Sequence, residues 1–147
     1  MPCPRPLAKA GMWLWYTKVN NMAEKKVLIV EDNEQNMELF RELLLSKGYT
    51  VIESIDGEMA LEKAVMETPD LILMDIQIPK IDGVEVTRRI RNNYPALNKT
   101  VIIAITAHAM KGDRENFLKA GFNDYIAKPV LIKAFLQTVE NYMHPSV

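Results

Sequence analysis

The sequence has little of what several classes of protein depend on. It holds one cysteine, Cys3, which excludes an internal disulfide and a cysteine-based zinc site and fits a reducing compartment. The formal net charge is −1, so no excess of positive charge draws the chain to nucleic acid or anionic lipid. No apolar run approaches the roughly 20 residues that a membrane-spanning helix needs. We therefore expect a cytoplasmic protein with no direct binding to DNA or membrane.

What remains is the composition of one globular domain. The chain has 147 residues, of which 48% are hydrophobic and 25% are charged. We place the domain at residues 24–144 and a short tail at residues 145–147. Residues 1–23 carry three of the eight prolines and both tryptophans, and Lys18 interrupts their apolar stretch too early for a secretory signal. We interpret residues 1–23 as a disordered extension; a docking peptide or weak membrane anchor using the tryptophans is the alternative.

Five short apolar runs alternate with amphipathic stretches from Lys25 onward. The runs are rich in β-branched residues, and four of them lack polar alternation, which predicts the strands of a parallel sheet covered on both faces. They are Val27–Val30, Tyr49–Ile52, Leu71–Met74, Val101–Ile105 and Asp124–Ala127. Alternating β and α units predict an α/β fold with right-handed crossovers and helices on both faces of the sheet.

The helices between these runs have recognisable ends. Asn33 can cap the first helix, Gly48 can end it, and Pro69 disfavours helical geometry in the residue before it. The five predicted helices run from about Glu34 to Lys47, from about Glu58 to Thr68, onward from Asp82-Gly83, up to Ala120-Gly121, and across Ile132–Met143. Arg88, Arg89 and Arg91 fall in the third helix, and we interpret them as a solvated basic face.

Reactive side chains follow four of the five predicted strands. These residues are Glu31 and Asp32 after the first strand, Asp75 after the third, Thr106 after the fourth and Lys128 after the fifth. In parallel sheets, sites form beyond the carboxyl ends of the strands, where the strand order reverses. With the order 2-1-3-4-5, the first and third strands are neighbours and their carboxylates converge. Each residue taken singly would pass for a turn, cap or surface residue.

Three carboxylates beside one ammonium leave two negative charges uncompensated. A like-charge pair about 4 Å apart costs roughly 1 kcal/mol in water and about 4 kcal/mol at an effective dielectric near 20. Either one group takes up a proton or a cation binds. No histidine or cysteine is expected nearby, and an all-oxygen ligand set suits Mg²⁺ better than zinc.

The pattern resembles the response-regulator receiver family, also called CheY-like, from Lys26 to Met143. The matching motifs are VLIVEDN (27–33), DLILMDIQIPKIDG (70–83), IAITAHA (103–109) and YIAKP (125–129). The opening VEDNEQNMELF is most similar to DivK-type single-domain regulators and to the receivers of hybrid sensor kinases. The resemblance implies a flavodoxin-like (βα)5 doubly wound sandwich with a five-stranded parallel sheet of order 2-1-3-4-5.

The resemblance also implies roles for single residues. Asp75 would be the phosphoacceptor, and Glu31, Asp32, Asp75 and the backbone carbonyl of Gln77 would hold Mg²⁺. The remaining implied site residues are Lys128 and Thr106 as contacts to the phosphoryl group, Tyr125 as the switch partner of Thr106, and Pro129 as the second residue of a cis peptide bond.

A signalling role follows from these implied residues. The phosphoryl donor would be a phosphohistidine on a sensor histidine kinase or a histidine phosphotransfer protein. Phosphorylation would draw Thr106 toward the site and let Tyr125 rotate inward, which would change the face formed by the fourth helix, fifth strand and fifth helix. The protein would then be a switch in a two-component phosphorelay and no enzyme beyond self-catalysed phosphoryl transfer and autodephosphorylation.

Other functions fit the motifs less well. A haloacid-dehalogenase phosphatase needs a second aspartate two residues after the first, where this chain has Gln77. A flavodoxin-like cofactor binder needs a phosphate-cradling loop after the first strand, where this chain is acidic. The intact acidic, threonine and lysine positions argue against a degenerate receiver. Only four residues follow Met143, so we expect a free-standing receiver; a fragment of a hybrid kinase stays open.

Overall fold

The computed structural model describes residues 25–107 and 113–145. The extension proposed at residues 1–23 and most of the tail at residues 145–147 lie outside this part of the chain. The described residues form one five-stranded sheet. Its strands are β1 (Lys26–Val30), β2 (Thr50–Ser54), β3 (Leu71–Asp75), β4 (Val101–Thr106) and β5 (Asp124–Ala127). All neighbouring strands are parallel and their order is β2-β1-β3-β4-β5, so the predicted fold class and strand order are confirmed.

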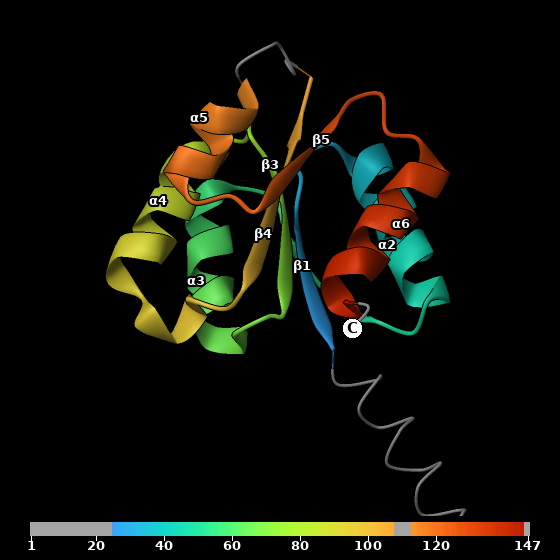
Figure 1. Ribbon diagram of the computed structural model, residues 1–147, viewed down its shortest axis with the longest axis horizontal. Helices are drawn as coiled ribbons and strands as arrows, with labels where there is room; N and C mark the ends of the chain where they lie inside the picture. The colour runs from blue at the N-terminus through green and yellow to red at the C-terminus, as the bar shows by residue number, and fades with distance from the viewer. Residues whose placement is uncertain (1–24, 108–112, 146–147) are drawn as a thin grey trace, which may run out of the picture.

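Helices cover both faces of the sheet (Figure 1). They are α2 (Glu34–Ser46), α3 (Gly57–Glu67), α4 (Gly83–Asn93), the 3-10 helix η1 (Pro95–Leu97), α5 (Asp113–Ala120) and α6 (Ile132–Met143). Figure 1 shows α2 and α6 on one face and α3, α4 and α5 on the other. The five helices that we expected, four between the strands and one after the last, are therefore α2 to α6.

Alternation along the strands divides the apolar side chains into two cores. Val27 and Ile29 of β1 point toward α2 and α6, where Phe40 and Phe135 stack with ring centroids 5.2 Å apart. Leu28 and the other alternate residues point to the opposite core under α3 and α4. All five residues of β3 are buried, because this strand lies between neighbours and beneath helices on both faces. The central strand is therefore a rigid support for the residue at its end, Asp75.

Helix ends follow the expected local chemistry, with small shifts. Asn33 caps α2 by accepting a hydrogen bond from the Asn36 amide, and Gly48 has φ +88° just beyond the helix. The helix α3 begins one residue earlier than expected, at Gly57, because Asp56 supplies its cap. None of the helices in the described ranges is both long and apolar enough to span a bilayer.

Candidate functional site

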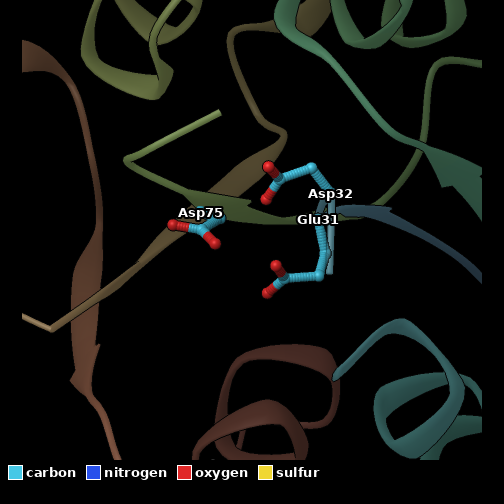
Figure 2. A group of neighbouring side chains, drawn as sticks. All are labelled: Glu31, Asp32 and Asp75. Carbon is cyan, nitrogen blue, oxygen red and sulfur yellow. The ribbon is translucent and has the colours of Figure 1, made fainter. Parts of the chain in front are cut away.

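Three carboxylates meet at the carboxyl ends of β1 and β3. Glu31 and Asp32 follow β1, and Asp75 is the last residue of β3. Figure 2 shows the carboxylates of Glu31 and Asp32 reaching toward the side on which Asp75 projects. One oxygen from each of the three lies within 4.8 Å of the others. The two strands pair directly, so their adjacent ends bring the acids together, as the strand order predicted.

Glu31 is the buried member of this cluster. Its side chain is 1% exposed, and its Oε2 accepts a hydrogen bond from the Asn33 amide at 3.1 Å, while Oε1 has no hydrogen-bond partner. Burial is the main reason that the pKa of Glu31 rises from 4.5 to about 7; the Asn33 hydrogen bond lowers it, and the charge of Asp75 raises it. Burial, with a smaller contribution from the charge of Asp75, therefore disfavours the charged form of Glu31.

Lys128 supplies the positive charge of the site. Its Nζ donates a hydrogen bond to Asp75 Oδ2 at 2.9 Å and lies 3.7 Å from Glu31 Oε1. Burial alone lowers the pKa of Lys128, but the hydrogen bond to Asp75 and the charges of the three acids outweigh it and raise that pKa. The peptide bond between Lys128 and Pro129 is cis, as the resemblance implies.

Asp75 is 4% exposed, and the loop that follows it holds its side chain in place. Its Oδ1 accepts a hydrogen bond from the Gln77 amide at 3.0 Å. Gly83, which sequence reasoning used only as a helix start, lies against this residue: a Cβ there would be 2.5 Å from the Asp75 carbonyl oxygen. The backbone of Asp75 therefore leaves no room for a side chain larger than that of glycine at position 83.

Thr106 and Tyr125 lie on the neighbouring strands β4 and β5 but have different surroundings. Thr106 ends β4, is 4% exposed, and its carbonyl accepts a hydrogen bond from the Lys128 amide at 2.8 Å. Tyr125 is half-buried on β5, with its ring 5.7 Å from that of Phe117 on α5. The structure thus puts Thr106 at the carboxylate edge and Tyr125 one strand away, against α5.

The residues present fit a hard divalent cation. The donors are all oxygen atoms, and one of them, Glu31 Oε1, is buried without a hydrogen-bond partner. Three acids face one lysine, so a divalent ion would balance the remaining negative charge. Oxygen donors of this kind are those that Mg²⁺ prefers.

Comparison with known proteins identifies the family. A model of the response regulator receiver domain matches residues 27–140. The chain belongs to this family. The polar-differentiation response regulator DivK of Brucella anthropi is 45% identical to this receiver over 119 residues, which are 81% of this chain and 96% of DivK.

Solved structures of receivers resemble this one. The receiver domain of the sensor histidine kinase PA1611 from Pseudomonas aeruginosa, determined with a magnesium ion coordinated in its active site cleft, is 39% identical, with a TM-score of 0.73 over 81% of this chain and 97% of that one. The BeF3-activated receiver domain of RstA from Klebsiella pneumoniae is 26% identical, with a TM-score of 0.74 over 82% and 99%. This receiver therefore has the fold and family of phosphorylation-dependent two-component switches.

One interpretation of this receiver's surface was wrong. Arg91 does not belong to a solvated basic face, because its guanidinium donates hydrogen bonds to the carbonyls of Gly121, Leu97 and Thr100 and to Asn123 Oδ1. Burial lowers its pKa. A run of arginines in the sequence gives no sign of which of them turns inward.

Proposed function

We propose that this receiver accepts a phosphoryl group on Asp75 from a phosphohistidine, with Mg²⁺ bound beside it. One observation carries the proposal: carboxylate oxygens of Glu31, Asp32 and Asp75 share a space under 5 Å across, next to the Lys128 ammonium. A cluster of acids on strand ends with one lysine is suited to holding a cation and a phosphoryl group together.

The residues of the chain have distinct tasks in the transfer. One Asp75 carboxylate oxygen forms a bond to phosphorus while the bond from phosphorus to the donor imidazole nitrogen breaks, and that nitrogen keeps the electron pair. Lys128 moves its hydrogen bond from Asp75 to a phosphoryl oxygen, where its charge opposes the added negative charge. The Thr106 hydroxyl donates to another phosphoryl oxygen.

Glu31, Asp32, Asp75 and the Gln77 carbonyl are the ligands that we propose for Mg²⁺. The ion supplies charge neutralisation for the transferring group. Glu31 gives the unpartnered Oε1, and Asp32 is the exposed ligand of the set. The hydrogen bond from the Gln77 amide to Asp75 Oδ1 supports the assignment of Gln77, because it keeps that residue beside the site.

The output surface that we propose is the face formed by α5, β5 and α6. Thr106 moving toward the phosphoryl group would make room for the Tyr125 ring to turn inward. A hollow of about 460 Å³ lies beside Tyr125, between β5 and α6. The apolar side chains Leu131 and Ile132 are exposed at the start of α6, 69% and 49% respectively, as expected for a surface that binds a protein.

The proposed partners are of two kinds. A sensor histidine kinase or a histidine phosphotransfer protein would donate the phosphoryl group, and a downstream protein would bind the α5–β5–α6 face. Loss of the phosphoryl group by hydrolysis at the same site would reset the switch. We place this exchange in the cytoplasm, where a chain with one cysteine stays reduced.

Phosphorylation by a small-molecule donor tests the proposal. The protein is incubated with acetyl phosphate and Mg²⁺, and the intact mass is measured for the native chain and for Asp75→Asn. We expect one added phosphoryl group on the native chain, released by hydroxylamine, and none on Asp75→Asn. Equal labelling of the two proteins would remove Asp75 as the acceptor.

A further inference from the structure

The loop at residues 76–82, which joins β3 to α4, carries Gln77. Its two ends are tied to the sheet and the helix. The Ile76 amide donates to the Ile105 carbonyl at 3.2 Å, and the Gly83 amide donates to the Ile76 carbonyl at 3.0 Å. The Ile78 side chain is 9% exposed and anchors one more point. The rest of the loop needs another support if the Gln77 carbonyl is to stay in place.

The start of α3 provides that support. The Gly57 amide donates a hydrogen bond at 3.1 Å to the carbonyl of Pro79 in the loop at residues 76–82, which we call the metal loop. The approach is so close that a Cβ on Gly57 would lie 1.9 Å from the Ile81 carbonyl oxygen. Glycine is required here by space, since any other residue would push residues 79–81 away from α3.

Asp56 fixes the position of Gly57 and adds an ion pair. It is 7% exposed, and its Oδ1 accepts from the Met59 amide at 2.7 Å as the cap of α3. The buried Ser54 hydroxyl donates to the Asp56 carbonyl at 2.9 Å. The other carboxylate oxygen of Asp56, Oδ2, lies 3.6 Å from Nζ of Lys80, a loop residue with φ +70°. The side chain of Asp56 therefore joins the α3 cap to the metal loop.

We propose that Asp56 and Gly57 are positioning residues for the metal site. They touch none of the proposed ligands but hold the loop of residues 76–82, and through it the Gln77 carbonyl, where Mg²⁺ needs it. The inference rests on the proposed function. A ligand that must be ordered during binding lowers affinity, so loosening this support weakens Mg²⁺ binding before it disturbs the cores.

The first test compares two glycine substitutions. Gly57→Ala forces a Cβ against the backbone of the metal loop, whereas Gly121→Ala places a Cβ 2.6 Å from Arg91 Cγ, at a position with φ +111° at the other end of the sheet. Mg²⁺ is titrated into each folded protein and into the native chain, and amide chemical shifts give the Kd. We expect about tenfold weaker binding for Gly57→Ala, the usual effect of losing an outer-shell support, and less than a twofold change for Gly121→Ala. A Kd for folded Gly57→Ala within twofold of native would overturn the positioning role.

A second pair of substitutions tests the ion pair. Lys80→Gln removes the charge that faces Asp56, and Lys80→Arg retains it. Weaker Mg²⁺ binding in the first and native binding in the second are the expected results. Equal affinities for all three proteins would exclude the ion pair from the support.

The native chain gives a measurement that depends on no substitution. If opening the Gly57–Pro79 contact abolishes binding, Mg²⁺ at ten times its Kd slows hydrogen exchange of the Gly57 amide about tenfold. The Gly48 amide, bonded to the Leu45 carbonyl at the far end of α2, is the control and should not change. Unchanged exchange at Gly57, in a chain that binds Mg²⁺, would refute this inference alone. Failure of the native chain to bind Mg²⁺ would refute the proposed function as well.

Discussion

Replacing Glu31 with glutamine should stabilise the metal-free protein. Glu31 is 1% exposed and its pKa rises to about 7 from 4.5, so ionisation at high pH leaves a poorly compensated charge in the fold. A difference of this size is equivalent to about 3 kcal/mol, at about 1.4 kcal/mol per pH unit. Glutamine keeps the shape of the side chain, and its amide can donate toward Asp75. The free energy of unfolding should therefore rise in Glu31→Gln.

The raised pKa of Glu31 also determines whether the free energy of unfolding rises or falls with pH. The raised pKa means that the folded protein holds a proton on Glu31 that the unfolded chain releases above pH 4.5. The native protein therefore loses stability as pH rises from 4.5 to about 7, and the variant does not. Urea unfolding in EDTA, followed by circular dichroism, should show little difference at pH 4.5 and about 3 kcal/mol in favour of Glu31→Gln at pH 8.

A matched control separates burial from net charge. Glu62 is exposed on α3, and Glu62→Gln makes the same change in charge away from the site. It should alter the free energy of unfolding by less than about 0.5 kcal/mol at either pH. Added Mg²⁺ should stabilise the native protein more than Glu31→Gln. A variant less stable than native at pH 8 in EDTA would refute the reasoning, because the buried carboxylate would then be satisfied without a cation.

Two further substitutions test other parts of the molecule. Lys128→Ala removes the ammonium 2.9 Å from Asp75. The variant should still bind Mg²⁺, but BeF3⁻ should no longer change the amide chemical shifts of β5 and α6. A native-like response to BeF3⁻ would exclude Lys128 from the switch. Arg91→Ala breaks hydrogen bonds to four carbonyls and Asn123, so urea unfolding should show a loss of about 3 kcal/mol. Arg88→Ala, which breaks one exposed pair with Glu85, should cost less than about 1 kcal/mol, and equal losses would contradict the structural role of the Arg91 hydrogen bonds.

The alternation of strands and helices could be predicted because it depends on short-range patterns, whereas the strand order that brings the acids together came from the resemblance. Unbroken apolar runs require strands buried on both faces, and the strand order places the ends of β1 and β3 side by side. Glu31, Asp32 and Asp75 each follow such a run directly, so their convergence follows from the topology. The resemblance implied that Lys128 contacts the phosphoryl group, and the structure places its ammonium 2.9 Å from Asp75 Oδ2.

Contacts between loops could not be predicted in this way. Asp56 and Gly57 directly precede the expected start of the second helix at about Glu58, and nothing near them in the sequence points to Pro79 or Ile81. Arg88 and Arg91 lie in the same charged stretch of sequence, and nothing in that stretch distinguishes them. Arg91 points inward because of its position on the helix, which faces the α5–β5 connection, whereas Arg88 pairs with Glu85 at the surface. The contacts of Gly57 and of Arg91 both depend on how segments far apart in the sequence pack together, and the hydrophobic periodicity of the sequence carries no information about this. The lack of a hydrogen-bond partner for Glu31 Oε1 likewise depends on how distant segments pack around it.

The attachment of α5 has a mechanical consequence. None of its residues is buried, and its ring contacts run from Phe117 to Phe122 and Tyr125. The strand that carries Asp75, in contrast, is buried along its whole length. Displacing α5 would therefore uncover part of one core, around Phe122, while displacing β3 would open both cores. Asp75 can therefore keep its position when α5 moves, because β3 is held by both cores whereas α5 packs against only one of them.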